Sequence, residues 1–262
     1  MKKTYLVLAS ALVFGSTACD STRQAQDMGA DTPAESARAE EPMPTGEVMS
    51  KDGIKVYGFD DSPKFPDARL TLNTPQAGGK VAAGPVQFDY DLANYELSKM
   101  TPAEHAEHMA NSSEGQHIHN IVDNEPYTAH YNTEFTKELA EGDHVILSFL
   151  SRSYHESLKH KDAYDLRMVT AGNPSEKMEF NMDAPHMFYS RPKGEYVGKD
   201  TKQVMLDFYL VNTELSPTGN KVRATINGTE FMLDRWLPYI MEGLPMGENT
   251  IKLELVDSEG NL

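Results

Sequence analysis

Two stretches of this chain decide its fold because each repeats the other: Phe88-Asp-Tyr-Asp-Leu-Ala-Asn-Tyr-Glu-Leu-Ser98 and Leu206-Asp-Phe-Tyr-Leu-Val-Asn-Thr-Glu-Leu-Ser216. Asp, Leu, Asn, Glu, Leu and Ser are identical in register between them. Further along, residues 141–150 align with residues 246–255, and both segments have a Gly followed by an acidic residue before an apolar run. A repeat of this length predicts two copies of one domain rather than a solenoid of small units.

Both copies have the pattern of short β-strands. Apolar and polar residues alternate over runs such as 145–150 and 250–255, and Gly, Pro, Asn and Asp interrupt the runs. This spacing predicts an all-β protein with two tandem immunoglobulin-like β-sandwich domains. The expected boundaries are 52–172 for a histidine-rich sandwich and 173–262 for the second sandwich. Because Cys19 is the only cysteine, no internal disulfide can join the sheets.

The two copies differ in two places. Copy one has an insert after Ser98 in which Thr101-Pro-Ala-Glu104 forms a capping-box pattern, so we expect a short helix there. Copy one also continues beyond residue 150 through a further strand-like run, residues 163–169, that copy two lacks. The second sandwich is therefore expected to lack its last strand, so either this chain is a fragment of a longer one or an open edge is left for a protein partner.

The amino terminus has the pattern of an export signal. Lys2 and Lys3 precede an apolar run and small residues, which predicts that residues 1–18 are a signal peptide rather than a membrane span. Cys19 follows at once, and this start resembles that of bacterial lipoproteins, which implies lipidation at Cys19 and attachment to a membrane of the bacterial cell envelope. Ser16 departs from the usual lipobox, so plain secretory cleavage remains an alternative. Residues 19–51 are acidic and poor in apolar side chains, which predicts a disordered tether.

The charge of the chain limits its partners. The formal net charge is −16, and removal of the signal peptide would remove two lysines and no acids. Such an acidic protein is not expected to bind nucleic acid or an anionic lipid surface. Attachment to a periplasmic or outer-membrane surface would therefore depend on the lipid at Cys19.

Eight of the nine histidines lie between Thr101 and His160. His117 and His119 are two apart in a strand-like run, so both side chains point to the same face. We expect these two, with His155 and His130, to bind a transition metal, because zinc and copper favour several neutral imidazoles. The positions that match His117 and His119 in copy two are Lys221 and Arg223, so the fold itself does not require the histidines.

A second set of candidate ligands is weaker. His105, His108 and Met109 would share one face of the expected helix, and a thioether beside imidazoles would favour copper. His144 follows the Glu-Gly-Asp turn at residues 141–143, where it can orient the turn as well as bind a metal.

Three segments of the first copy together resemble a family of small, histidine-rich exported bacterial domains of unknown function. They are the strand Gly115-Gln-His-Ile-His-Asn-Ile-Val-Asp123, the strand Glu141-Gly-Asp-His-Val-Ile-Leu-Ser-Phe-Leu150 and the segment Tyr154-His-Glu156. This resemblance covers about residues 80–160. The whole architecture also resembles uncharacterised lipoproteins of Bacteroidota. Neither resemblance implies an activity, so the ligand hypothesis depends on the residues themselves.

Two functions stay open at this point. The first is metal binding, of copper or zinc, by the histidine cluster of the first sandwich. The alternative is a surface or periplasmic interaction module without a metal, binding a protein, peptide or glycan. Its contact face would use four tyrosines that equally suit a sandwich core: Tyr127, Tyr131, Tyr154 and Tyr164.

The sequence does not favour an enzyme. Histidines spaced as His-x-His also occur in zinc hydrolases, but this chain lacks the alternating strand and helix pattern of those barrels. It also has no Gly-x-Ser-x-Gly elbow and no phosphate-binding loop. We therefore predict no catalytic residue.

Overall fold

Sixteen β-strands and two short 3₁₀-helices make up the described part of the chain, and this confirms the expected all-β class. The structure, a computed structural model, describes residues 44–262, apart from the side chains of Glu104 and His105. The expected signal peptide, Cys19 and most of the expected tether lie outside these residues. No helix in the described part is both long enough and apolar enough to cross a membrane.

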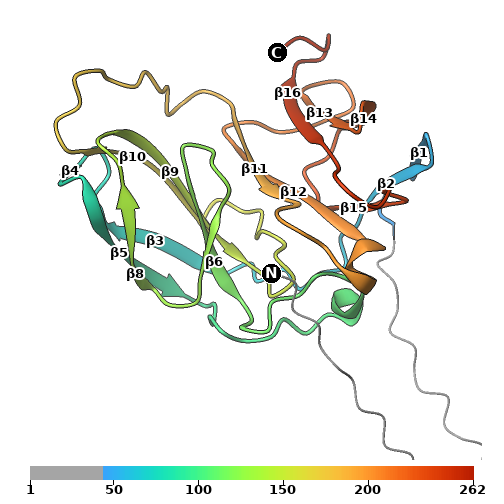
Figure 1. The fold of residues 1–262 in the computed structure, drawn as a ribbon, viewed down its shortest axis with the longest axis horizontal. Helices are drawn as coiled ribbons and strands as arrows, with labels where there is room; N and C mark the ends of the chain where they lie inside the picture. The colour runs from blue at the N-terminus through green and yellow to red at the C-terminus, as the bar shows by residue number, and fades with distance from the viewer. Residues whose placement is uncertain (1–43) are drawn as a thin grey trace, which may run out of the picture. The chain divides into compact units, whose positions relative to one another are not determined.

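The first sandwich consists of two sheets (Figure 1). The three-stranded sheet has the order β3-β5-β8, with β3 (Arg69–Thr74), β5 (Gly84–Ala93) and β8 (Glu134–Leu139). The five-stranded sheet has the order β4-β10-β9-β6-β7, with β4 (Lys80–Val81), β10 (Tyr164–Ala171), β9 (Gly142–Ser151), β6 (His117–Val122) and β7 (Thr128–His130). Alternate apolar residues of both sheets, such as Phe88, Ile118 and Leu150, fill one core.

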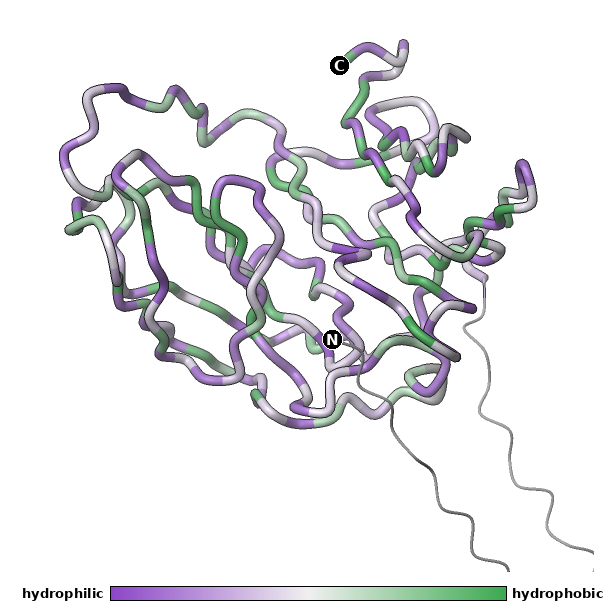
Figure 2. The backbone as a smooth tube through the Cα atoms, in the orientation of Figure 1, coloured by the Kyte–Doolittle hydropathy of each residue, from purple (hydrophilic) through white to green (hydrophobic). Residues whose placement is uncertain are grey.

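The second sandwich also has one three-stranded and one five-stranded sheet, but the repeated strands β5 and β12 lie in sheets of different size. Its three-stranded sheet has the order β14-β13-β16, with β14 (Thr229–Leu233), β13 (Lys221–Ile226) and β16 (Ile251–Val256). Its five-stranded sheet has the order β1-β2-β15-β12-β11, with β1 (Met49–Lys51), β2 (Ile54–Gly58), β15 (Tyr239–Glu242), β12 (Val204–Val211) and β11 (His186–Arg191). Leu206, Val222 and Phe231 belong to its separate core. Figure 2 shows green, hydrophobic stretches on the strands of both sandwiches between purple, hydrophilic ones.

The strand pairing differs from the division expected from sequence. Residues 49–51 form β1 rather than tether, and β2 pairs antiparallel with β15 of the second sandwich. Ile54 and Val56 are two residues apart on β2, so both side chains lie on the same face of the sheet. Both are buried in the core of the second sandwich. The segment before the first sandwich thus completes the sheet of the second.

The repeated strands β9 and β16 have different neighbours. In the first sandwich β9 pairs with β6 on one side and with β10 on the other. In the second, β16 pairs with β13, and no other strand of residues 44–262 pairs with it.

A third apolar layer lies where β6 and β9 of the first sandwich face β11 and β12 of the second. Phe149 of β9 stacks on Tyr209 of β12, with ring centroids 4.6 Å apart, and both side chains are fully buried. β12 is therefore buried on both faces, since its even-numbered residues fill the second core and Tyr209 and Val211 on the other face belong to this layer. The layer supplies the wall against which the histidines lie.

The insert after β5 contains a 3₁₀-helix, η1 (Glu104–His108), but the expected capping box does not form. The residue before the helix is Ala103, and it provides no side-chain cap. The hydroxyl of Thr101 instead donates to Gln116 Oε1 at 3.0 Å and accepts from the backbone N–H of Ser153. A tertiary contact thus replaces the local cap. The second 3₁₀-helix, η2 (Gly198–Thr201), precedes β12.

Candidate metal site

Strand β6 presents His117 and His119 on one face, while Ile118 between them fills the first core. Gly115 fixes the start of this strand. Its φ is +86°, and a Cβ there would lie 2.7 Å from the carbonyl carbon of Ser98, so a side chain fits neither the backbone conformation nor the space. The carbonyl of Gly115 accepts a hydrogen bond from His117 Nδ1 at 2.8 Å. This glycine therefore also orients the first imidazole.

The third imidazole, His155, comes from the loop between β9 and β10. Arg152 and Glu156 close this loop in two ways. The backbone N–H of Arg152 donates to the carbonyl oxygen of Glu156, and the two side chains form an ion pair with Nη1 and Oε1 2.8 Å apart. His155 has φ +69°, in the left-handed region that histidine enters more readily than bulky or β-branched residues do. A residue held in this conformation at the tip of a tightly bonded loop is typical of a functional site.

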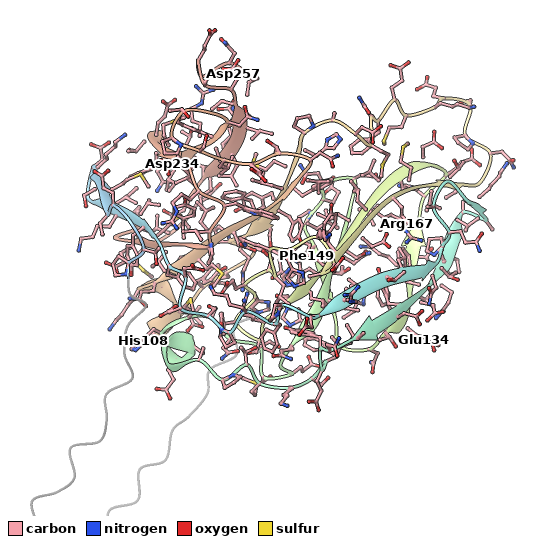
Figure 3. The ribbon with its side chains drawn as sticks, turned by 180° about the vertical axis from the view of Figure 1, so that it is seen from behind. His108, Glu134, Phe149, Arg167, Asp234 and Asp257 are labelled. Atoms are coloured by element: carbon pink, nitrogen blue, oxygen red, sulfur yellow. The ribbon has the colours of Figure 1, made fainter. Side chains whose placement is uncertain are left out.

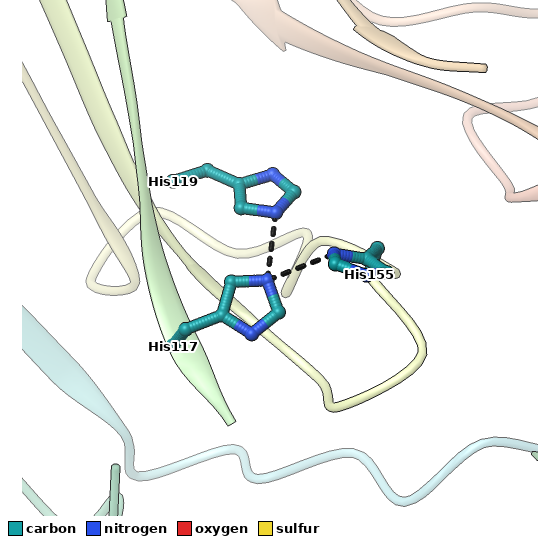
Figure 4. Close-up of side chains that lie close together, drawn as sticks. All are labelled: His117, His119 and His155. Carbon is teal, nitrogen blue, oxygen red and sulfur yellow. Dashed lines mark hydrogen bonds between the residues drawn. The ribbon is translucent and has the colours of Figure 1, made fainter. Parts of the chain in front are cut away.

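The three imidazoles converge on one point (Figure 4). His117 Nε2 lies 2.8 Å from His119 Nε2 and 3.0 Å from His155 Nδ1. One nitrogen of each ring lies within 4.8 Å of the other two. We call His117, His119 and His155 the histidine triad. His117 and His119 are fully buried, whereas His155 is partly exposed.

The surroundings keep the triad neutral. Burial lowers the pKa of His117 to about 4, although its hydrogen bond to Gly115 opposes the shift. Burial holds the pKa of His119 well below its usual value. Electrostatic repulsion from four nearby basic side chains lowers it further: His117, His155, Arg191 and Lys193. Burial and then the charge of Arg191 lower the pKa of His155 as well. All three rings are therefore uncharged at neutral pH, as metal ligands must be.

Aromatic rings fix the triad in place. Tyr127 stacks on His119 with ring centroids 3.7 Å apart and an interplanar angle of 14°. Phe149 contacts the same imidazole edge-on at 5.1 Å, and Tyr131 lies 5.1 Å from His117. Tyr127 and Tyr154 are buried, so these two tyrosines do not belong to an exposed contact face.

The structure does not bring His130 to the triad. His130 is the cross-strand partner of Ile118, so its side chain lies on the face of the sheet opposite to His117 and His119. There it stacks on Phe135, and its Nε2 lies 2.7 Å from the hydroxyl of Thr128. The expected set of four ligands is thus reduced to three.

The weaker candidates are also elsewhere. His144 Nδ1 lies 2.7 Å from Asp123 Oδ2, and its Nε2 lies 2.9 Å from the carbonyl oxygen of Ala140, so this side chain orients the turn. Met109 is buried in an apolar cluster with Phe59, Met205 and Ile240. His108 ends η1, away from Phe149 and the layer between the sandwiches (Figure 3). The side chain of His105 lies outside the described part.

Two cations near the triad were not expected from the sequence. Arg191 ends β11 with only 6% of its surface exposed, and Lys193 follows two residues later. Lys193 Nζ lies 4.4 Å from the ring centroid of Tyr127 and donates a hydrogen bond to the carbonyl oxygen of that residue. Arg191 ends an ordinary amphipathic strand and Lys193 follows it, so only the packing of one sandwich on the other shows that Lys193 lies against Tyr127.

No protein-family model matches this chain, and no curated protein matches it. Solved structures that match include fibronectin(III)-like modules of CbhA from Clostridium thermocellum, 10% identical, with a TM-score of 0.27. That match covers 73% of this chain and 87% of the other. Another is the surface protein SGBP-B of the Bacteroides ovatus mixed-linkage glucan utilization locus, in complex with a mixed-linkage heptasaccharide. It is 8% identical with a TM-score of 0.25, and the match covers 74% of this chain and 45% of that protein. At these values neither neighbour assigns a function to this chain.

Proposed function

We propose that the protein binds one transition-metal ion, zinc or copper, through the histidine triad. The observation that carries this proposal is the convergence of three neutral ring nitrogens, with 2.8 and 3.0 Å between His117 Nε2 and its two neighbours. Ligands at about 2.0–2.1 Å from a tetrahedral ion lie about 3.3 Å apart. The two short distances from His117 Nε2 are therefore within about half an ångström of the spacing that such an ion needs.

The distribution of protons supports the same function. His117 Nδ1–H donates to the carbonyl of Gly115, so Nε2 carries the only lone pair of this ring. Both His119 Nε2 and His155 Nδ1 approach that single lone pair. A metal ion replaces this crowded contact with one bond from each ring. The bond from His117 Nδ1–H to a backbone carbonyl is also the usual outer support of a ligating imidazole.

The donor set limits the choice of metal. Three imidazoles without a cysteine or methionine suit zinc or copper rather than a metal selected by soft sulfur ligands. Three protein ligands leave a fourth position open, as in zinc sites that bind a further ligand. The buried position of Met109 removes the thioether that would have favoured copper.

The test is metal analysis of the protein purified without a histidine tag, followed by zinc and copper titrations. We expect one equivalent of metal in the wild type and none in the His117→Ala/His119→Ala variant. The matched control is His130→Gln/His144→Gln, which removes two histidines outside the triad and should keep the full equivalent. Equal binding by both double variants would refute a site at the triad.

A second candidate function is binding of an extended peptide from a partner protein at β16. The supporting observation is that β16 pairs only with β13 among the described strands, so its other edge presents unpaired backbone groups. Proline substitutions at alternate positions of β16 should abolish capture of such a partner while metal binding stays unchanged. We also retain the proposal that lipidated Cys19 attaches the protein to the bacterial cell envelope.

A further inference from the structure

A groove in the second sandwich lies at the start of β16. It has a volume of about 720 Å³, and Tyr189 of β11, Tyr196 and Ile251 of β16 are among the residues that line it. Tyr196 and Ile251 also pack on the second core, so the groove reaches this core from the surface. The internal repeat identifies the element that fills the matching position in the first sandwich.

That element is β10. It pairs antiparallel with β9 on one side and parallel with β4 on the other. The repeat aligns β9 with β16, and it aligns Lys80-Val81 of β4 with Tyr196-Val197. In the part of the chain that the structure describes, no strand pairs with Tyr196-Val197 or with the second edge of β16. The groove is therefore where a strand equivalent to β10 would run.

Burial along the two aligned strands differs accordingly. Ile146 and Leu150 of β9 belong to the first core and are 0% exposed. The aligned residues of β16, Ile251 and Leu255, pack on the second core but are only partly buried. In the first sandwich, Val169 of β10 contributes to the core beside β9. An added strand with apolar side chains at alternate positions would cover Ile251 and Leu255 in the same way.

The groove is also acidic. Glu195 and Glu248 line it, and no lysine or arginine among the described residues does. Neither carboxylate has an ion pair or a hydrogen bond within residues 44–262. The repeat aligns Glu248 with Asp143, whose carboxylate accepts a hydrogen bond from the hydroxyl of Thr170 near the carboxyl end of β10. Because both acids of the groove lack a donor, a lysine or arginine near the carboxyl end of an added strand fits this place best.

We propose that the groove takes an extended segment of a partner protein that runs antiparallel to β16, with apolar residues at alternate positions and a lysine or arginine near its carboxyl end. This inference rests on the second candidate function, peptide binding at β16, and names the chemistry of the partner. Backbone pairing supplies affinity, while the apolar and basic side chains supply specificity. Residues 19–43 of this chain do not fit, because they are acidic and poor in apolar side chains. A second copy of a chain with a net charge of −16 is repelled by the two acids.

The test measures the fluorescence anisotropy of the peptide fluorescein-Thr-Val-Ser-Val-Thr-Val-Lys-Val-amide as protein is added. The wild type should bind it in a saturable way. Exchange of the peptide lysine for glutamate should weaken binding at least about tenfold, because a charge-assisted contact becomes a repulsion. Glu195→Gln/Glu248→Gln should remove most of this preference. The matched control Glu134→Gln/Glu138→Gln, on β8 of the first sandwich, should keep it.

Peptides methylated on the backbone nitrogen test the pairing with β16. Alternate N–H groups of a strand point to opposite edges, so methylation of one alternate set should abolish binding, and methylation of the other set should weaken it much less. A peptide held by its side chains alone would not show this alternation, which would overturn the proposed strand geometry.

The outcomes separate this inference from the candidate function on which it rests. Equal affinity for the lysine and glutamate peptides, or a preference that Glu195→Gln/Glu248→Gln leaves unchanged, would overturn the basic partner and leave a peptide site at β16. A dimer of the protein that the lysine peptide dissociates would show that a second copy fills the groove instead. Failure of the wild type to bind any of the peptides would refute the peptide site itself.

Discussion

His117 and His119 place their Nε2 atoms 2.8 Å apart although Ile118 separates them in the chain. The relationship follows from the strand, because alternate side chains of β6 point to the same face and Ile118 points into the first core. The second sandwich covers that face, and the burial of both rings results from this cover as much as from the strand itself.

His155→Asn should abolish tight metal binding without unfolding the protein. Asparagine tolerates the positive φ of this position but supplies no imidazole, so the metal dissociation constant should rise at least about tenfold. The free energy of unfolding should change by no more than about 0.5 kcal/mol. Metal titration and urea denaturation measure the two effects, and an unchanged dissociation constant would exclude His155 as a ligand.

Acid should destabilise the metal-free protein. The triad has lowered pKa values in the folded state, about 4 for His117, whereas an unfolded histidine titrates near 6.5. Below about pH 6.5 the unfolded chain therefore binds protons that the folded triad does not, and stability falls as pH decreases through this window, by up to about 1.4 kcal/mol per pH unit for each ring. Thermal unfolding between pH 7.5 and pH 5 measures the effect.

His144 provides the opposite control. Burial lowers its pKa, but the hydrogen bonds to Ala140 and Asp123 outweigh burial and raise the pKa above its usual value. Its contribution is thus complete at low pH and is lost as pH rises through the raised pKa. His144→Gln should leave the acid destabilisation in place, whereas His117→Gln/His119→Gln should reduce it. A pH profile that is the same in all variants would contradict the assignment.

Phe149→Ala should weaken the layer between the sandwiches. Its ring is fully buried against Tyr209 and contacts His119, so truncation should cost about 3–5 kcal/mol in the free energy of unfolding. Water admitted to the cavity should also raise the pKa of His119 towards its usual value, which proton NMR titration can follow. Phe65→Ala, between β2 and β3 and partly buried against the first core instead of this layer, should cost less. Equal costs would indicate that the layer contributes little.

Glu156→Gln should loosen the loop that carries His155. The Arg152–Glu156 pair is almost fully buried, and removing one charge leaves the other uncompensated, at a cost of about 3 kcal/mol. Metal affinity should fall with stability, because the loop no longer holds His155 toward His117. The exposed pair Lys99–Glu96 is the control, and Glu96→Gln should change stability by less than about 1 kcal/mol. Unchanged metal affinity in Glu156→Gln would show that the ion pair does not position the ligand.

Cys19→Ala should release the protein from membranes. If Cys19 carries the lipid, the wild type incorporates radiolabelled palmitate in a bacterial host and fractionates with the envelope, whereas the variant does neither. A wild type found only in the soluble fraction would favour plain secretory cleavage.

The period-two pattern of residues was sufficient to predict the all-β class, because strands such as β5 and β13 alternate core residues with more exposed ones. The same period places His117 and His119 on one face. It does not give the register of the next strand, so only the structure shows that His130 faces the other way. The capping box predicted at Thr101 was wrong, because the hydroxyl of Thr101 accepts a hydrogen bond from the backbone N–H of Ser153 instead of capping the helix.

Arg191 illustrates what local patterns cannot reveal. Its position at the end of β11 resembles that of any polar strand terminus, and only the tertiary structure shows that its side chain is buried. The pairing of β2 with β15 could not be read from local patterns either, because it joins segments from opposite ends of the described chain.

That pairing also constrains the order of folding. The strands of the first sandwich, β3 to β10, lie together in the sequence and can pair as soon as residue 171 has emerged. β2 can pair with the adjacent β1 at once, but its other edge must wait for β15 and stays unpaired until residues 239–242 arrive. Until then this early segment is open to mispairing, and a chaperone that shields residues 49–58 would protect the second sandwich rather than the first.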